Sequence, residues 1–299
     1  MRFATAETPV LPPERASVFF EGIFSTPRLQ HPEGVAVGPG GEVWCGSENG
    51  QILKIARDGS RIEEIASTGG FTLGLAFDGE ATLFACDLKH ACVFRLDLAS
   101  RRLERFTPPG IVIPNYPVVD RARGCLYVSD SHHFADPGPG VWRYDLATGE
   151  GGLWYDRPMT FANGMALEPG GGGLLVAETF ARRVSRIAIG PGGEAGDRSD
   201  AATDLPGLPD GLAFDDAGDL FIACYEPSRI LRLDRAGRVE VYVEDPTAHT
   251  LCHPTNIAFD GPLLYAANLG RWHISRVETN TKGRPLWAWA RPRPVSLPG

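Results

Sequence analysis

The chain has 299 residues, of which 43% are apolar and 22% charged, and its formal net charge is −8. Acidic and basic residues are interspersed, which disfavours a nucleic-acid-binding surface. No apolar stretch is long enough to span a bilayer, and the first residues lack the apolar segment of a secretory signal. We therefore expect a cytoplasmic protein without nucleic-acid or membrane partners. Its six scattered cysteines are interpreted as free thiols, with a Cys86–Cys92 disulfide as the minor alternative.

A pattern of strand-like segments recurs six times along the chain. Each repeat opens with an anchor residue and a short apolar run, followed by a turn rich in Gly, Pro or Asp, a second apolar run and two further strands. Successive anchors lie between 40 and 48 residues apart. The pattern, without long amphipathic helical windows, predicts an all-β, six-bladed β-propeller with four antiparallel strands per blade. The anchors are Glu33, Leu73, Asn115, Asn163, Asp210 and Thr255.

The strand-like segment at residues 17–24 precedes the first complete repeat. It stands where a fourth strand would stand before the next anchor, so we expect it to close the blade that begins near Thr255. Residues 1–299 are treated as one propeller domain, and the role of the tail 282–299, with Trp287 and Trp289, is left open. Third strands are expected at 51–55, 93–97, 141–145 and 230–234, and fourth strands at 62–66, 103–106 and 239–243.

The anchors should form a ring, because the innermost strand of every blade begins at the same mouth of a propeller channel. Two carboxylates, Glu33 and Asp210, and two amides, Asn115 and Asn163, would converge there without a basic partner. A hard divalent cation would relieve the repulsion, and Ca²⁺ accepts this set of oxygen ligands. A turn at the strand start explains any one such residue, but four at equivalent positions favour a metal site.

A second ring is expected where the second strands end, outside the anchors. Its members Asp130 and Glu178 should orient ligands and waters rather than contact the metal. The loop 131–140 is the longest connection predicted at this mouth, and its His132 and His133 are candidates for substrate contact or proton transfer. The full second ring is Ser47, Asp87, Asp130, Glu178, Cys224 and Asn268, and the other candidate substrate contacts are Ile113, Phe134, Tyr225, Arg271 and Trp272.

These motifs resemble the calcium-dependent six-bladed propeller hydrolases of the senescence marker protein/gluconolactonase (regucalcin-like) family. The similarity is carried by HPEG at 31–34, FANG at 161–164, LPDG at 208–211 and Asn115. The resemblance implies that the Glu, Asn and Asp of the three tetrapeptides bind the metal and that Asn115 lies at the metal or the substrate. Sugar-lactonase members carry Arg at the position of Ile113, and this departure favours a less polar lactone or ester. Residues 176–180 also resemble strictosidine-synthase-like propellers, which lack the metal quartet.

The sequence therefore predicts a metal-dependent hydrolase of a small-molecule lactone, in which water attacks a carbonyl polarised by a calcium-type ion. Asp210 is expected to act as general base or as nucleophile, and Asn115 as a ligand or carbonyl-positioning group. Mn²⁺, Mg²⁺ and Zn²⁺ are alternatives to Ca²⁺ in vitro. Three other functions stay open: hydrolysis of phosphotriesters or other esters, a metal-free strictosidine-synthase-like activity that uses an acid such as Glu178, and a non-enzymatic ligand-binding propeller.

Overall fold

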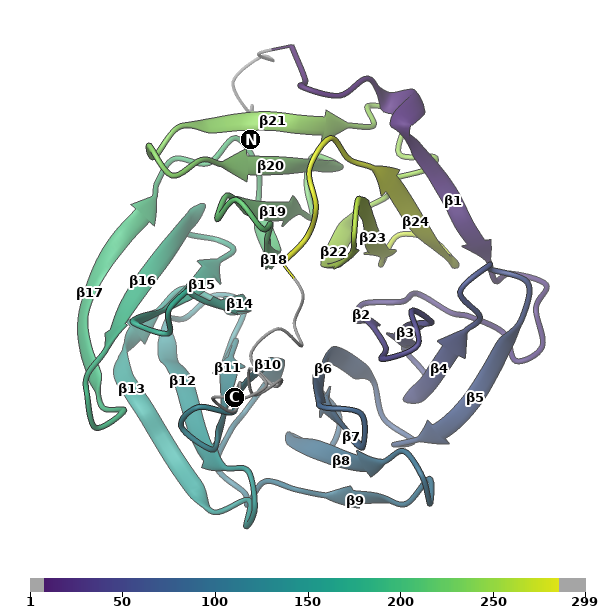
Figure 1. Cartoon of the computed structure of the whole chain (residues 1–299). Helices are drawn as coiled ribbons and strands as arrows, with labels where there is room; N and C mark the ends of the chain where they lie inside the picture. Colours follow the sequence, from purple (N-terminus) through teal and green to yellow (C-terminus); the bar gives the residue numbers. More distant parts are fainter. Residues whose placement is uncertain (1–7, 285–299) are drawn as a thin grey trace, which may run out of the picture.

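The computed structural model describes residues 8–284, which form six four-stranded antiparallel sheets around one axis (Figure 1). Within this range the only helical turn is a 3-10 turn, η1 (Pro13–Arg15). The predicted all-β six-bladed propeller is confirmed. No helix of the described part of the chain is long and apolar enough to cross a membrane.

Within each blade the strands follow one another from the axis outwards. The innermost strands are β2 (Val35–Val37), β6 (Thr72–Asp78), β10 (Pro114–Asp120), β14 (Ala162–Leu167), β18 (Pro209–Phe214) and β22 (Pro254–Asp260). The second strands are β3 (Val43–Gly46), β7 (Thr82–Asp87), β11 (Cys125–Asp130), β15 (Gly173–Glu178), β19 (Leu220–Cys224) and β23 (Leu263–Asn268). The third strands are β4 (Gln51–Ile55), β8 (Cys92–Asp97), β12 (Gly138–Asp145), β16 (Arg183–Ile189), β20 (Arg229–Leu233) and β24 (His273–Glu278). The outermost strands are β5 (Ile62–Ser67), β9 (Leu103–Arg105), β13 (Gly151–Met159), β17 (Ala195–Ala202), β21 (Val239–Glu244) and β1 (Ala16–Glu21).

The N-terminal strand completes the sixth blade, as predicted. β1 pairs antiparallel with β24, and Glu21 stands opposite His273. The predicted segment 17–24 runs three residues too far, because the chain turns at Gly22. The Gly22 N–H donates to the Trp272 carbonyl at 2.7 Å, and a Cβ at this position would lie 2.3 Å from the Cβ of Leu29. Both ends of the repeat array are thus joined in one sheet, which leaves no free seam among the described blades.

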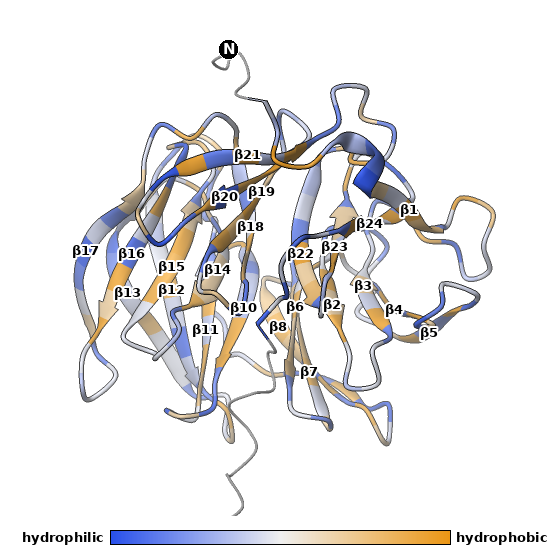
Figure 2. Ribbon diagram, turned by 45° about the horizontal axis from the view of Figure 1, so that its top comes forward, coloured by the Kyte–Doolittle hydropathy of each residue, from blue (hydrophilic) through white to orange (hydrophobic). Residues whose placement is uncertain are grey.

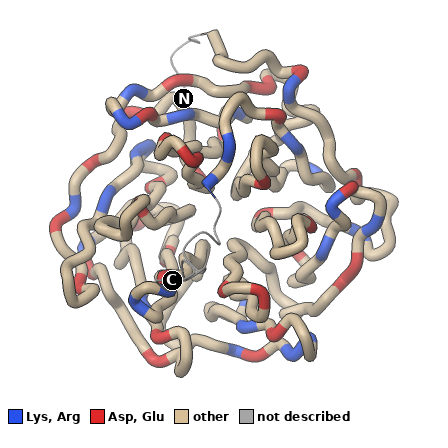
Figure 3. Tube along the Cα trace, viewed as in Figure 1, with Lys and Arg blue, Asp and Glu red and all other residues tan. Residues whose placement is uncertain are grey.

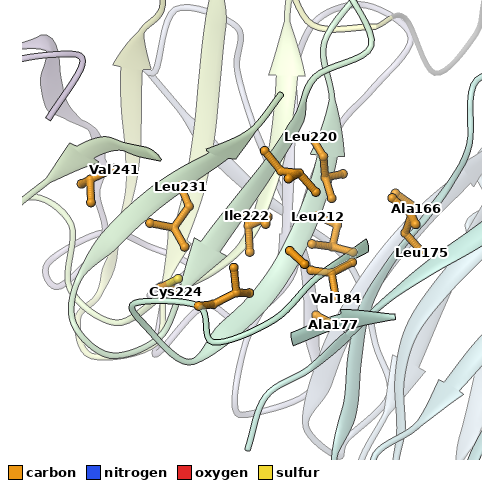
Figure 4. Packing of buried hydrophobic residues seen from close by; sticks show 13 residues of the cluster. Ala166, Leu175, Ala177, Val184, Leu212, Leu220, Ile222, Cys224, Leu231 and Val241 are labelled. Atoms are coloured by element: carbon orange, nitrogen blue, oxygen red, sulfur yellow. The ribbon is translucent and has the colours of Figure 1, made fainter. Parts of the chain in front are cut away.

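The hydrophobic core lies between neighbouring blades. Six clusters of buried residues occur, one at each blade–blade interface. Because side chains alternate along a strand, Ile222 and Cys224 of β19 face the fourth blade (Figure 4). Phe221 and Ala223 of the same strand face the sixth blade. The apolar colouring of the inner strands in Figure 2 follows from this two-sided burial. All six cysteines are free and buried. Figure 3 shows that Lys and Arg residues alternate with Asp and Glu residues around the ring.

Glycines directly after the anchors let the innermost strands approach one another closely. A Cβ at Gly34 would lie 2.1 Å from the Leu73 carbonyl oxygen, and one at Gly164 would lie 2.3 Å from the Asp210 carbonyl oxygen. No other residue fits without shifting the neighbouring backbone. The close approach draws the six strand starts together around the axis.

The chain that follows β24 crosses the end of the propeller opposite the anchors. Thr281 Oγ1 donates to Asp215 Oδ2 at 2.8 Å, and the Gly283 N–H donates to the Gly261 carbonyl at 2.8 Å. Both acceptors belong to hairpin turns that follow the innermost strands β18 and β22. Of the tail 282–299, residues 285–299, with Trp287 and Trp289, lie outside the described residues.

Candidate functional site

The structure brings the polar anchors together at one end of the channel. Asn163 Nδ2 donates to Asp210 Oδ2 at 3.0 Å, and Thr255 Oγ1 donates to the Glu33 carbonyl at 2.7 Å. The carboxylates of Glu33 and Asp210 are near enough for the charge of Asp210 to raise the pKa of Glu33. Glu33 and Asp210 are only 4% and 5% exposed. The anchors therefore form a buried polar ring rather than an open, solvent-filled mouth.

Each of the four predicted metal ligands presents one oxygen atom that has no hydrogen-bond partner within residues 8–284. These atoms are buried, and leaving a buried acceptor unpaired is unfavourable unless an ion or water satisfies it. Four such atoms on one ring are therefore the expected feature of a cation site. They are Glu33 Oε2, Asn115 Oδ1, Asn163 Oδ1 and Asp210 Oδ1.

The two carboxylates are strained electrostatically when no cation is bound. Burial, followed by the charge of Asp210, raises the pKa of Glu33 well above its usual range. Burial raises the pKa of Asp210 to about 7, and the amides of Asn163 and Asn256 act in the opposite direction. Protonating both groups, or placing a cation between them, relieves the repulsion.

The donor set fits a hard divalent cation. Among residues 8–284 no group of three or more His, Cys, Asp or Glu side chains is arranged so that it could hold a metal ion by itself. The ring instead offers two carboxylates and two amide oxygens, which suit Ca²⁺ or Mg²⁺ better than a metal that prefers nitrogen or sulfur ligands.

Three buried polar residues of the site were missed by the sequence reasoning. Ser131 and Thr179 hydrogen-bond to the ring amides Asn115 and Asn163, each at 3.1 Å. Asn256 lies near enough to lower the pKa of Asp210. Its side-chain Nδ2 and Oδ1 atoms are buried, and neither makes a well-formed hydrogen bond within the described chain. A signal was present for the first two, because both are hydroxyl residues that follow directly after a second-ring carboxylate.

The second-ring carboxylates Asp130 and Glu178 hold the chain that leads into the anchors. Asp130 Oδ1 accepts the Ile113 N–H at 2.8 Å, and Glu178 Oε2 accepts the Thr160 N–H at 2.8 Å. Glu178 also accepts two hydrogen bonds from Arg183 and one from Ser185. Both carboxylates thus act on the ring through the backbone before it, and their role toward ligands and waters stays a prediction.

An arm of three phenylalanine rings flanks Asn163. Phe161 precedes this anchor by two residues, and its ring centroid lies 5.0 Å from that of Phe134 and 4.9 Å from that of Phe180. Phe134 is 68% and Phe180 is 42% exposed. Phe161 adopts a φ of 56°, which is unfavourable for a residue with a side chain and directs its ring toward the other two. The arm forms an apolar wall beside the ring.

The two histidines of the predicted loop make contacts within the loop. His133 Nδ1 accepts the N–H groups of Ala135 and Asp136 at 3.2 and 3.3 Å. The ring of His132 packs on Gly138, where a Cβ would lie 2.2 Å from its Cγ. The predicted loop 131–140 is too long, because β12 already begins at Gly138. A role for either histidine in substrate contact or proton transfer is not tested by these contacts.

The remaining predicted rim residues lie around the opposite side of the ring. Tyr225 stacks on His253 at 4.6 Å between ring centroids, and its pKa is raised by burial and then by the charge of Asp210. Trp272 contacts His31 at 4.9 Å between ring centroids. Arg271 Nη2 donates to the Ala248 carbonyl at 3.3 Å, which directs its guanidinium to a loop.

Two sequence families match parts of the chain. The SMP-30/Gluconolactonase/LRE-like region matches residues 118–266, and the N-terminal strictosidine-synthase-like region matches residues 24–55. A Drosophila melanogaster protein, the adipocyte plasma membrane-associated protein Hemomucin, is 26% identical over 59% of this chain. The chain spans about a third of that relative's length, since the match covers 36% of it. The cytoplasmic location therefore stays a prediction.

Solved structures share the fold over nearly the whole chain. A gluconolactonase from Xanthomonas campestris is 19% identical with a TM-score of 0.71, and the match covers 90% of this chain and 89% of that one. A calcium-binding regucalcin from Agrobacterium tumefaciens is 18% identical with a TM-score of 0.72, covering 93% and 98%. A putative gluconolactonase is 20% identical with a TM-score of 0.73, covering 90% and 93%.

Fold and site together define a six-bladed β-propeller that carries, at one mouth, a buried ring of oxygen atoms able to coordinate a cation. The family model that matches residues 118–266 shows that the chain belongs to the SMP-30/gluconolactonase/LRE-like family.

Proposed function

We propose that the protein is a divalent-cation-dependent hydrolase of lactones, with Ca²⁺ as the preferred ion. The observation that carries this proposal is the set of four buried oxygen atoms without partners in the described chain, on Glu33, Asn115, Asn163 and Asp210. These four residues would hold the ion. When bound, a divalent cation supplies positive charge that polarises a substrate carbonyl and stabilises the negative charge that develops as water adds.

The residues of the ring and its surroundings have different roles in the proposed reaction. The Asn163 amide donates to Asp210 Oδ2 at 3.0 Å and so fixes the orientation of the carboxylate. We assign the Asp210 carboxylate as the group that takes the proton from the attacking water. Asn115 and Glu33 orient the site from the other side, and the Phe134–Phe161–Phe180 arm excludes water from one flank.

Two alternatives are less well supported. A metal-free reaction of the strictosidine-synthase type would need Glu178 as acid or base. Burial acts to raise the pKa of Glu178, but hydrogen bonds from Arg183, Ser185 and the Thr160 N–H hold that pKa below its usual value. A carboxylate saturated in this way does not exchange protons with a substrate near neutral pH. A propeller that binds its ligand without a cation would leave the four unpartnered oxygen atoms unexplained.

The direct test is hydrolysis of a substrate panel by the purified protein. The panel contains alkyl- and aryl-substituted lactones, gluconolactone, aryl esters and a phosphotriester, each assayed after chelation and again after addition of CaCl₂. We expect lactone hydrolysis that is lost with chelator and restored by Ca²⁺. Activity that persists unchanged in excess chelator would contradict the proposal, as would activity confined to phosphotriesters.

Substitution of Ile113 tests which lactones the site accepts. Ile113 packs beside the apolar cluster that contains Leu73, so its side chain offers no hydrogen bond to a sugar hydroxyl. We expect apolar lactones to have a higher kcat/KM than gluconolactone, and Ile113→Arg to narrow that ratio by about tenfold. The ratio of the two kcat/KM values checks this, and a preference of the unmodified protein for gluconolactone would reject it.

The phenylalanine arm should bind the apolar part of the substrate. Phe180→Ala removes an outer ring of the arm without touching the anchors, and we expect it to lower kcat/KM for aryl lactones by about three- to tenfold. Its effect on small unsubstituted lactones should be slight. The matched control is Phe24→Ala, because Phe24 is 93% exposed and lies outside the arm. Equal losses on every substrate would place the arm in a role other than substrate selection.

A further inference from the structure

We propose that Ser131 and Thr179 are positioning residues that fix which end of a ring amide faces the cation. The inference rests on the proposed function, because it assigns the two hydroxyls a task only if a cation binds at the ring. Ser131 would hold the side chain of Asn115, and Thr179 would hold that of Asn163. Each amide would then present its oxygen, rather than its NH₂ group, to the cation at the centre of the ring.

The contacts of Thr179 show how an amide is oriented. Thr179 Oγ1 lies 2.8 Å from the carbonyl oxygen of Pro209. A carbonyl oxygen only accepts, so the hydroxyl hydrogen must lie on this bond. The lone pairs of Thr179 are then left for Asn163, whose Nδ2 donates to the hydroxyl at 3.1 Å. With its nitrogen held there, Asn163 turns Oδ1 away from both partners, and Oδ1 has no hydrogen bond to the described chain.

The ring itself reinforces the orientation of Asn163. Its Nδ2 has a second acceptor, Asp210 Oδ2, at 3.0 Å. Both hydrogens of the NH₂ group are therefore used, and rotating the amide would place an oxygen against the Asp210 carboxylate. The hydroxyl of Thr179 and the carboxylate of Asp210 thus select the same orientation.

The same arrangement recurs one blade earlier. Ser131 Oγ donates to the Ala162 carbonyl at 2.8 Å and accepts from Asn115 Nδ2 at 3.1 Å. Asn115 Oδ1 is again buried and without a partner among residues 8–284. In both blades the hydroxyl residue follows the second-ring carboxylate and bonds the residue just before the next anchor. Two independent copies of one geometry indicate a device for orienting amides.

The orientation of the amide matters because its oxygen attracts a cation and its NH₂ group repels one. The carbonyl oxygen carries a partial negative charge and coordinates, whereas the NH₂ group would repel a divalent ion. A flexible amide would divide its population between these states, and reorienting it would cost part of the binding free energy of the ion. Groups that fix the orientation of a ligand typically raise metal affinity about 10- to 100-fold.

A purely structural role is the competing explanation, since both hydroxyls also tie neighbouring blades together. The two explanations predict different losses. A blade-tying hydroxyl affects the melting temperature of the cation-free protein and leaves Ca²⁺ affinity unchanged. An amide-orienting hydroxyl affects Ca²⁺ affinity even where the cation-free protein is as stable as before.

The experiment measures Ca²⁺ binding by isothermal titration calorimetry on the purified full chain, together with melting temperatures in chelator. Thr179→Val keeps the shape of the side chain and removes the hydroxyl, whereas Thr179→Ser keeps the hydroxyl. Ser131→Ala and Ser131→Thr form the second pair. Thr279→Val is the matched control, because the buried Thr279 hydroxyl donates to the Pro262 carbonyl at 2.7 Å at the other end of the propeller.

We expect Thr179→Val and Ser131→Ala to weaken Ca²⁺ binding about 10- to 100-fold, with Thr179→Ser and Thr279→Val close to the unmodified protein. Unchanged Ca²⁺ affinity in a folded Thr179→Val or Ser131→Ala variant would overturn the inference alone. Where one of these two variants does not fold, the other decides the question. An unmodified protein that binds no Ca²⁺ would overturn the proposed function and the inference with it, so the two failures are distinguishable.

Discussion

Replacing Asp210 by alanine is expected to abolish hydrolysis of every lactone that the protein accepts. The substitution removes one of the two carboxylates of the ring and, with it, the proposed proton acceptor. Loss of a general base together with a metal ligand should lower kcat by about 10³-fold or more. Rate measurements on the substrate panel at saturating CaCl₂ check this expectation.

The variant should nevertheless fold. Removing the Asp210 carboxylate relieves the repulsion that raises the pKa of Glu33. The matched control is Asp216→Ala, which removes the same charge from the opposite end of the innermost strand β18 and should leave turnover unchanged. Circular dichroism and gel filtration establish that both variants are folded. A folded Asp210→Ala protein with near-normal turnover would refute the proposed mechanism.

Glu33→Gln separates binding of the cation from the chemistry. The substitution keeps the size of the side chain but removes a negative charge whose Oε2 has no partner in the described chain. We expect weaker Ca²⁺ binding and turnover that recovers at high CaCl₂. Turnover that stays lost at saturating Ca²⁺ would assign Glu33 a direct part in the reaction.

The sequence was sufficient to predict the architecture because the same pattern of apolar runs and turns recurs in every blade. Apolar runs at a constant spacing fix the number of blades, and the anchors occupy one register, so residues as distant as Glu33 and Asp210 were correctly expected to meet. The closing strand was also predictable, since residues 17–24 fill the slot of a missing fourth strand. Its end was not, because the turn at Gly22 depends on tertiary contact with Leu29 and Trp272.

The amide-orienting hydroxyls escaped prediction for a physical reason. Ser131 and Thr179 matter through bonds to the carbonyls of Ala162 and Pro209 in the next blade, and such contacts leave no trace in the periodicity of one repeat. The extent of burial was missed as well. The ring of polar anchors was expected at the mouth of a channel, and its depth of burial was not foreseen. Glycines such as Gly164 bring the strands close together, and Glu33 and Asp210 are almost completely buried.

The second large effect concerns the stability of the cation-free protein and its dependence on pH. Asp210→Asn is expected to be more stable than the unmodified protein in chelator at about pH 8, and equally stable at about pH 4. The reason is the raised pKa of Asp210, which burial moves from the ordinary range of a carboxyl group to about 7. A shift of this size corresponds to an upper value on the order of 4 kcal/mol.

The sign follows from proton linkage. A carboxyl group with a raised pKa in the folded state favours folding while it is protonated, so its contribution is fully present below about pH 4. The contribution is lost as the pH rises toward 7, because the folded protein must then bury an uncompensated charge. Glu33 acts in the same direction, since burial and the charge of Asp210 raise its pKa as well. The amide introduced by Asp210→Asn carries no charge and avoids the loss.

Urea unfolding in chelator across this pH range measures the effect, and Asp145→Asn serves as a control that should change stability in the opposite direction. Hydrogen bonds from the Thr148 backbone and hydroxyl lower the pKa of Asp145, so the Asp145→Asn variant should lose stability above about pH 4.

Saturating Ca²⁺ should stabilise the unmodified protein and remove the advantage of Asp210→Asn, because the cation binds only the folded ring. An Asp210→Asn variant that is less stable than the unmodified protein at every pH in chelator would show that the buried carboxylates are not in conflict. The ring would then lack the electrostatic need for a cation from which its proposed function is argued.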